Sequence, residues 1–138
     1  MYLAEHSGAV ASTEEIARFY GISRHHLVRV VQTLHANSFV KVSTGRGGGV
    51  TLARDPLEIN LGEVVRKAEP GFRIVECFDL ETNTCGIVSD CRLRGVLSQA
   101  LDAFFKVLDG YSLADLVRNA RRRPSDAWVP IETLISAP

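Results

Sequence analysis

The chain has 138 residues, of which 46% are hydrophobic and 23% are charged, and its 16 basic residues balance its 16 acidic ones. This length suits one domain, or a small domain with an added helical arm, and no apolar run approaches the ~20 residues of a membrane span. No secretion signal is recognisable, so we expect a cytoplasmic protein whose thiols stay reduced.

The neutral total charge hides an asymmetry along the chain. Residues 1–54 carry six basic and three acidic side chains, whereas residues 55–117 carry six basic and eleven acidic ones. A basic first third beside an acidic middle predicts that only one end of the molecule faces a polyanion.

The first 37 residues predict three helical segments. Residues 1–6 are typical of the last turns of a helix that ends at Gly8, and we expect its earlier turns to precede Met1. Ser12 or Thr13, with acids directly after them, predicts the start of a second helix. Ser23 is then expected to cap a third helix that runs from Arg24 to about Asn37.

The second and third of these helices predict a helix-turn-helix. Ala17 is small enough for the helices to cross closely, and Gly21, four residues later, permits the positive φ that a tight turn needs. The buried side of the third helix is predicted to consist of apolar residues at helical spacing, namely Ile22, Leu27, Val30, Val31 and Leu34. The alternative is an ordinary helical hairpin.

Two short β-type runs, at 39–43 and 50–53, flank the glycine-rich segment 44–49. Glycines permit a tight turn with an exposed backbone, so the pair predicts the β-hairpin wing of a winged helix-turn-helix. A Walker phosphate loop is disfavoured, since no Gly-Lys-Ser/Thr that opens a helix follows.

The second half of the chain predicts a short helix from Asn60 or Leu61 to about Ala68, a polar loop, and a long helix from Leu93 to Leu108. Ser112 is expected to cap a last short helix through Val117. The predicted fold class is therefore mainly α with a small β-hairpin wing, a winged helix-turn-helix plus a long dimerisation helix. Its predicted parts are the DNA-binding domain 1–54, the linker helix and cysteine loop 55–92, the dimerisation helix and the helix after it 93–117, and a flexible tail 118–138.

All three cysteines of the chain, Cys77, Cys85 and Cys91, lie on the polar loop before the long helix. Clustered thiols in a reducing compartment indicate a ligand set more often than disulfides. Zinc sites usually show closely spaced cysteine pairs, which this loop lacks; zinc binding and inert surface thiols are the alternatives. A thiol enzyme is disfavoured, because all four histidines lie in the predicted DNA-binding part.

Residues on the N-terminal, exposed side of the third helix are candidates for DNA contacts. In a helix-turn-helix, such positions meet base edges and phosphates in the major groove. The alternative is a solvated helix face and a merely flexible hairpin. The candidates are Ser23, Arg24, His25, His26 and Arg29, together with Arg46, which the glycine hairpin would present to a narrow minor groove.

The long helix carries an apolar stripe with a 3.6-residue period. It offers more surface than one small wing can cover, so we expect a dimer interface rather than core alone. The stripe consists of Leu93, Val96, Leu97, Leu101, Phe104, Phe105 and Leu108.

Four segments together resemble the NsrR/IscR family of bacterial iron–sulfur winged-helix transcription regulators. They are Met-Tyr-Leu-Ala at 1–4, the helix segment 21–31, Gly-Arg-Gly-Gly-Gly-Val at 45–50, and the cysteine segment 76–93. The resemblance implies a homodimer on double-stranded operator DNA, in which the long helix crosses its symmetry mate.

The resemblance also implies a 2Fe–2S or 4Fe–4S cluster held by Cys77, Cys85 and Cys91, and repression that nitric oxide relieves. The family's first segment, which in some members supplies an acidic fourth ligand from the partner subunit, precedes Met1. The alternatives within the family are a regulator of iron–sulfur homeostasis and a cluster-free thiol-redox regulator.

Overall fold

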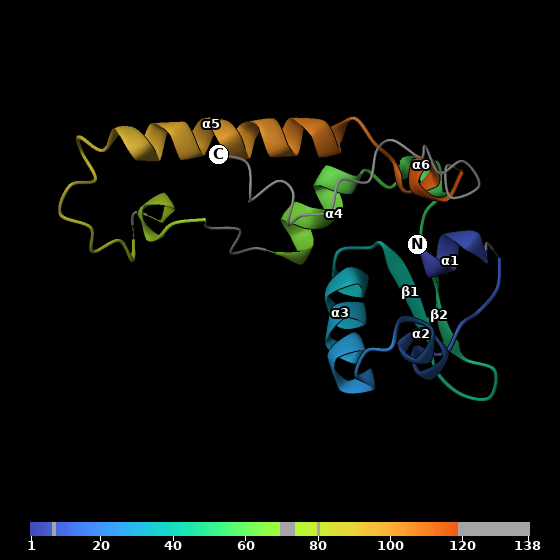
Figure 1. Cartoon of the computed structure of the whole chain (residues 1–138). Coiled ribbons are helices and arrows are strands. Elements are labelled where there is room, and N and C mark those ends of the chain that lie inside the picture. The colour runs from blue at the N-terminus through green and yellow to red at the C-terminus, as the bar shows by residue number, and fades with distance from the viewer. Residues whose placement is uncertain (7, 70–73, 80, 119–138) are drawn as a thin grey trace.

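A computed structural model describes residues 1–6, 8–69, 74–79 and 81–118 (Figure 1). The predicted fold class is confirmed, since the described chain is mainly helical with one two-stranded hairpin. The predicted tail lies outside these residues, apart from its first residue. The elements, in chain order, are α1 (Tyr2–Glu5), α2 (Thr13–Tyr20), α3 (Arg24–Ala36), β1 (Val40–Ser43), β2 (Gly49–Leu52), the 3₁₀ turn η1 (Pro56–Glu58), α4 (Leu61–Ala68), the 3₁₀ turn η2 (Glu76–Phe78), α5 (Arg92–Asp109) and α6 (Leu113–Arg118).

The helix-turn-helix forms for the local reasons that the sequence indicates. Ser12 is the N-cap of α2, and its hydroxyl accepts a hydrogen bond of 3.1 Å from the Glu15 amide. Gly21 ends α2 in the left-handed conformation, with φ of 64°. Ala17 is buried beside Leu27 and Val31 in the same core cluster, so a small side chain lies where the two helices pack.

Three details of α3 differ from the prediction. Ser23 is the N-cap residue, but its hydroxyl makes no capping hydrogen bond. Val30 is 37% exposed and Ile22 is 41% exposed, so their predicted burial is wrong. Val30 lies at the edge of the apolar face centred on Leu27 and Val31, and Ile22 belongs to the turn before the helix.

The hairpin wing packs on the helices through its inner residues. β1 and β2 pair antiparallel, with Val40 opposite Leu52 and Ser43 opposite Gly49. Ala11 joins them through an isolated bridge to Val50, with amide–carbonyl distances of 3.1 and 2.8 Å. The bridge ties the segment before α2 to the wing. α1, α2, α3 and the wing therefore share one core, and they are called the head below.

A second core cluster joins the head to the rest of the chain. Ala4 of α1, Phe39 just before β1, Ile59 just after η1 and Leu113 at the start of α6 are buried together. Figure 1 shows α5 extending from this region past α4, with the cysteine loop at its far end. Among the described helices, none is both long and apolar enough to cross a membrane.

Gly49 lies where the wing approaches the bridge segment. A Cβ added there would be 2.6 Å from the Ala11 carbonyl oxygen, so the backbone would have to shift. We expect Gly49→Ala to lower the free energy of unfolding by about 1–3 kcal/mol, as overpacking does. Urea unfolding followed by circular dichroism measures this change.

The matched control is Gly95→Ala in α5, where an added Cβ meets nothing within 4 Å. It should be neutral or should stabilise by about 0.5–1 kcal/mol, because alanine favours a helix over glycine. Equal destabilisation by both substitutions would contradict the close packing at Ala11.

Candidate DNA interface and cysteine site

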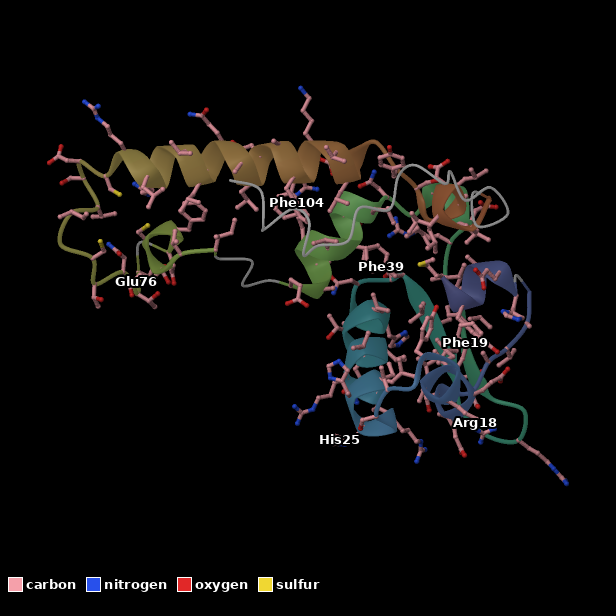
Figure 2. The ribbon with its side chains drawn as sticks, in the orientation of Figure 1. Arg18, Phe19, His25, Phe39, Glu76 and Phe104 are labelled. Carbon is pink, nitrogen blue, oxygen red and sulfur yellow. The ribbon has the colours of Figure 1, made fainter. Side chains whose placement is uncertain are left out.

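The predicted DNA-contact residues of α3 lie together at its N-terminal end and are all exposed, namely Ser23, Arg24, His25, His26 and Arg29. Figure 2 shows His25 pointing away from the rest of the molecule. The Ser23 hydroxyl is free of capping duty, and Arg24 and Arg29 form no ion pair with the described residues. These donors are therefore available to a ligand outside the chain.

The hairpin turn presents the sixth predicted residue, Arg46. Gly45 and Gly47 on either side of it have φ values of 97° and 83°, a conformation that favours glycine. Arg46 is exposed and forms no ion pair within the described chain. The wing and the α3 terminus therefore each present an arginine that forms no ion pair within the described chain.

The three cysteines lie along the loop that leads into α5. All three thiols are free; Cys77 is buried in η2, whereas Cys85 and Cys91 are half-buried. Short-range bonds shape the loop between them, since the Asn83 side chain accepts from the Cys85 amide at 3.1 Å and Thr84 donates to the Glu76 carboxylate at 3.2 Å. Figure 2 shows sulfur atoms along this loop, close to Glu76.

Three free thiols on one loop are the kind of donor set that an iron–sulfur cluster takes. Within the described ranges, no three His, Cys, Asp or Glu side chains converge closely enough to hold one ion. A cluster takes thiolates that lie farther apart, because its irons are bridged by sulfide. Cys91 is also the N-cap of α5, where the helix N-terminus favours negative charge.

The apolar stripe of α5 divides into two faces. Leu97, Leu101, Phe105 and Leu108 are half-buried, whereas Leu93 is 62%, Val96 61% and Phe104 43% exposed. Val107, 61% exposed, belongs to the second face; the sequence analysis missed it, although it follows Phe104 by three residues. The outer face of α5 is therefore Leu93, Val96, Phe104 and Val107, of which Leu93, Val96 and Val107 are more than half exposed within the described chain.

A connection between α4 and the end of α5 was not predicted from the sequence. Arg66 of α4 binds Asp109 at the end of α5 through two hydrogen bonds, of 2.7 and 2.8 Å, and its guanidinium lies 4.3 Å above the Phe105 ring. Asn60 donates to the Asp109 carbonyl at 2.8 Å and to the Tyr111 carbonyl at 3.3 Å. We call Asn60, Arg66 and Asp109 the joint.

α4 is held to the head by a second pair of the same kind. Arg54, which follows β2, binds Glu63 of α4 at 3.3 Å, and its guanidinium lies 4.9 Å above the Phe39 ring. Glu63 and Arg66 thus connect one short helix to the head on one side and to α5 on the other. α4 therefore contacts both the head and α5 through charged side chains.

Charge and space both define the joint. The Arg66 guanidinium holds the pKa of Asp109 below its ordinary 3.8, and Asp109 in turn raises the pKa of Arg66. A Cβ added at Gly62 would collide with the Asp109 carboxylate and approach the Arg66 guanidinium, so a larger side chain there would displace the ion pair.

Comparison with known proteins agrees with this architecture. The model of the Rrf2 family, described as iron-dependent transcriptional regulators, matches residues 1–119. The HTH-type transcriptional regulator NsrR of Bacillus subtilis (strain 168) is 48% identical over 116 residues, which cover 84% of this chain and 80% of that relative.

Two solved structures are similar in fold. CymR, the global cysteine regulator of B. subtilis, has a TM-score of 0.65 and 28% identity, with 85% of each chain covered. T. potens IscR has a TM-score of 0.64 and 24% identity, and the match covers 95% of this chain and 85% of that one.

The joint predicts a local effect of Asp109→Asn. The change keeps the shape of the side chain but removes the charge that Arg66 binds, so α5 should detach more often without global unfolding. The Leu61 and Leu113 amides, which bond the Tyr111 and Ile59 carbonyls across the joint, should then exchange hydrogen faster. Mass-spectrometric or NMR hydrogen exchange measures this.

The effect should depend on pH. Because the folded pKa of Asp109 is lowered, its contribution is complete above the ordinary value and is lost as the pH falls through the folded pKa. The difference between the variant and the wild type should therefore vanish in acid. Arg18→Gln, which breaks the exposed Arg18–Glu14 pair, is the control, and faster exchange at Leu61 in that variant would contradict a local joint.

Proposed function

The chain belongs to the Rrf2 family of transcriptional regulators, and we propose that it is a nitric-oxide-sensitive repressor that binds operator DNA as a homodimer and is switched by an iron–sulfur cluster. One observation carries the proposal. Three free thiols lie on one loop that leads directly into the longest described helix. The similarity to B. subtilis NsrR supports it.

The outer face of α5 supports the homodimer. Burying Leu93, Val96, Phe104 and Val107 would stabilise a dimer by roughly 25 cal/mol for each Å² of apolar surface removed from water. A second α5 crossing the first covers these side chains with the same side chains of its mate, as an isologous interface does. We infer that the half-buried face of α5 packs against its own subunit, whereas the outer face packs against the partner subunit.

The crossing also brings the cysteine loop near the other subunit. An 18-residue helix is about 27 Å long, so in one chain α5 separates the cysteines from the joint at its other end. When two such helices cross, each cysteine loop lies beside the partner's half of the molecule. A fourth ligand from the partner subunit fits this arrangement.

The head supports operator binding. The N-terminal end of α3 enters the major groove with Arg24, His25 and Arg29, while Arg46 on the wing reaches the adjacent minor groove. Two such heads read a palindrome when their α3 helices lie about 34–36 Å apart, one turn of the duplex.

The switch couples the loop to that spacing. When bound, the cluster supplies the iron that nitric oxide attacks. Cys77, Cys85 and Cys91 tied to one group order the loop and fix the crossing of the two α5 helices. α4 passes this geometry to each head through Arg66 and Glu63. When the three thiolates no longer share a bound group, the loop becomes free to move. The spacing of the two heads then changes, and the affinity for the operator falls.

Anaerobically purified protein tests this function directly. We expect brown protein that contains iron and sulfide, with visible absorption that bleaches on addition of nitric oxide. Its affinity for a palindromic duplex selected from random DNA should fall by about 5–150-fold, the usual range of an allosteric coupling. Colourless protein with full affinity would instead support a thiol-redox regulator.

Cys85→Ala tests the ligand set. The substitution should abolish iron content and the response to nitric oxide while leaving the helical circular dichroism unchanged, because Cys85 lies on a loop outside both core clusters. A variant that keeps both its iron and its operator affinity would reject the switch.

Two arginines should differ in how they bind DNA. Arg29→Ala should cost about 1–3 kcal/mol of operator affinity and relax the preference at one base pair, as loss of a base contact does. Arg46→Ala should weaken binding with a smaller salt dependence. Fluorescence anisotropy on the selected duplex and its point variants measures both, with Lys106→Ala on α5 as the charge-matched control. An effect of Lys106→Ala equal to either would contradict this interface.

A further inference from the structure

A cavity of about 640 Å³ lies between the cysteine loop and α5. Cys91 contributes to its wall, so the cavity adjoins the thiol at the start of the helix. Phe78 and Val88 of the loop and Leu101 of α5 supply apolar surface. The cavity is large enough for a bound group beside Cys91, and Ser89, Arg94 and Ser98 add polar groups to its wall.

One cation lines this cavity. Arg94 of α5 is half-buried there, one turn after Cys91. It forms no ion pair with any carboxylate of the described chain. The two arginines near α4 each have a carboxylate partner. Arg54 binds Glu63, and Arg66 binds Asp109. Among the described residues, Arg54 and Arg94 are the half-buried arginines, and only Arg54 has a carboxylate partner.

We propose that Arg94 is a positioning residue that supplies the positive counter-charge to the thiolate-bound cluster, and so sets its reduction potential and its resistance to loss. The inference rests on the proposed function, since it names how that site is stabilised. An iron–sulfur cluster with thiolate ligands is an anion, and its potential depends on net charge and on hydrogen bonds to sulfur. A fixed cation favours the reduced, more negative state and retains the thiolates.

The neighbouring arginine provides a matched control. Arg92 precedes Arg94 by two residues, so it points to a different side of α5, and it is exposed and does not line the cavity. Arg92→Gln and Arg94→Gln thus remove the same charge at nearly the same point of the helix, and only the second removes it from the cavity. Arg94→Lys keeps the charge but not the fork of donors.

The experiment uses full-length protein reconstituted anaerobically with iron and sulfide. Two quantities are measured on each variant, the midpoint potential by a spectroelectrochemical titration and the rate at which a chelator bleaches the visible absorption. We expect Arg94→Gln to shift the potential to more negative values and to lose its cluster several-fold faster than the wild type. Arg94→Lys should lie between the two, and Arg92→Gln should match the wild type.

The outcomes separate this inference from the proposed function. Wild-type protein that takes up no iron overturns both. Wild-type protein with a cluster, and equal potentials and release rates in Arg94→Gln and Arg92→Gln, overturns the role of Arg94 and leaves the proposed function standing. Circular dichroism of the apo-proteins checks that each variant keeps its helices.

Discussion

The ion pair between Arg66 and Asp109 is the contact on which the rest of the arrangement depends. It fixes the end of α5 to α4 with two hydrogen bonds, and Asn60 adds bonds to the backbone just beyond. The pair is about half exposed, so it adds little to global stability. Its importance is geometric, because it fixes the end of α5 against α4.

A single chain buries only part of the apolar surface of α5. One face of the helix is half-buried on its own subunit, with Phe105 under Arg66, while Leu93, Val96 and Val107 of the outer face are mostly exposed within the described chain. The cysteine loop lies at the end of α5 that is farthest from the joint (Figure 1). Dimerisation and cofactor binding are therefore expected to complete the same part of the fold, and each should stabilise the other.

The sequence predicted the features that depend on backbone conformation or on strict periodicity. Gly21 predicts a turn, the glycines beside Arg46 predict the wing, and the apolar stripe on α5 predicts a long helix. It could not show which residues meet across the fold. The pairing of Arg66 with Asp109 spans 43 residues, and Val30 was misplaced because periodicity alone does not reveal how far neighbours cover a helix edge.

The attachment of α5 at one end makes it a lever. Its length of about 27 Å means that a tilt of only about 10° at the fulcrum moves the far tip by about 5 Å. Rotation of α5 at its attached end and displacement of its far tip are therefore coupled. A modest rearrangement of the tip, resisted by few contacts there, arrives at the fulcrum as a small rotation with increased torque. A small force at the tip is therefore enough to rotate α5, provided that the tip moves by several Å.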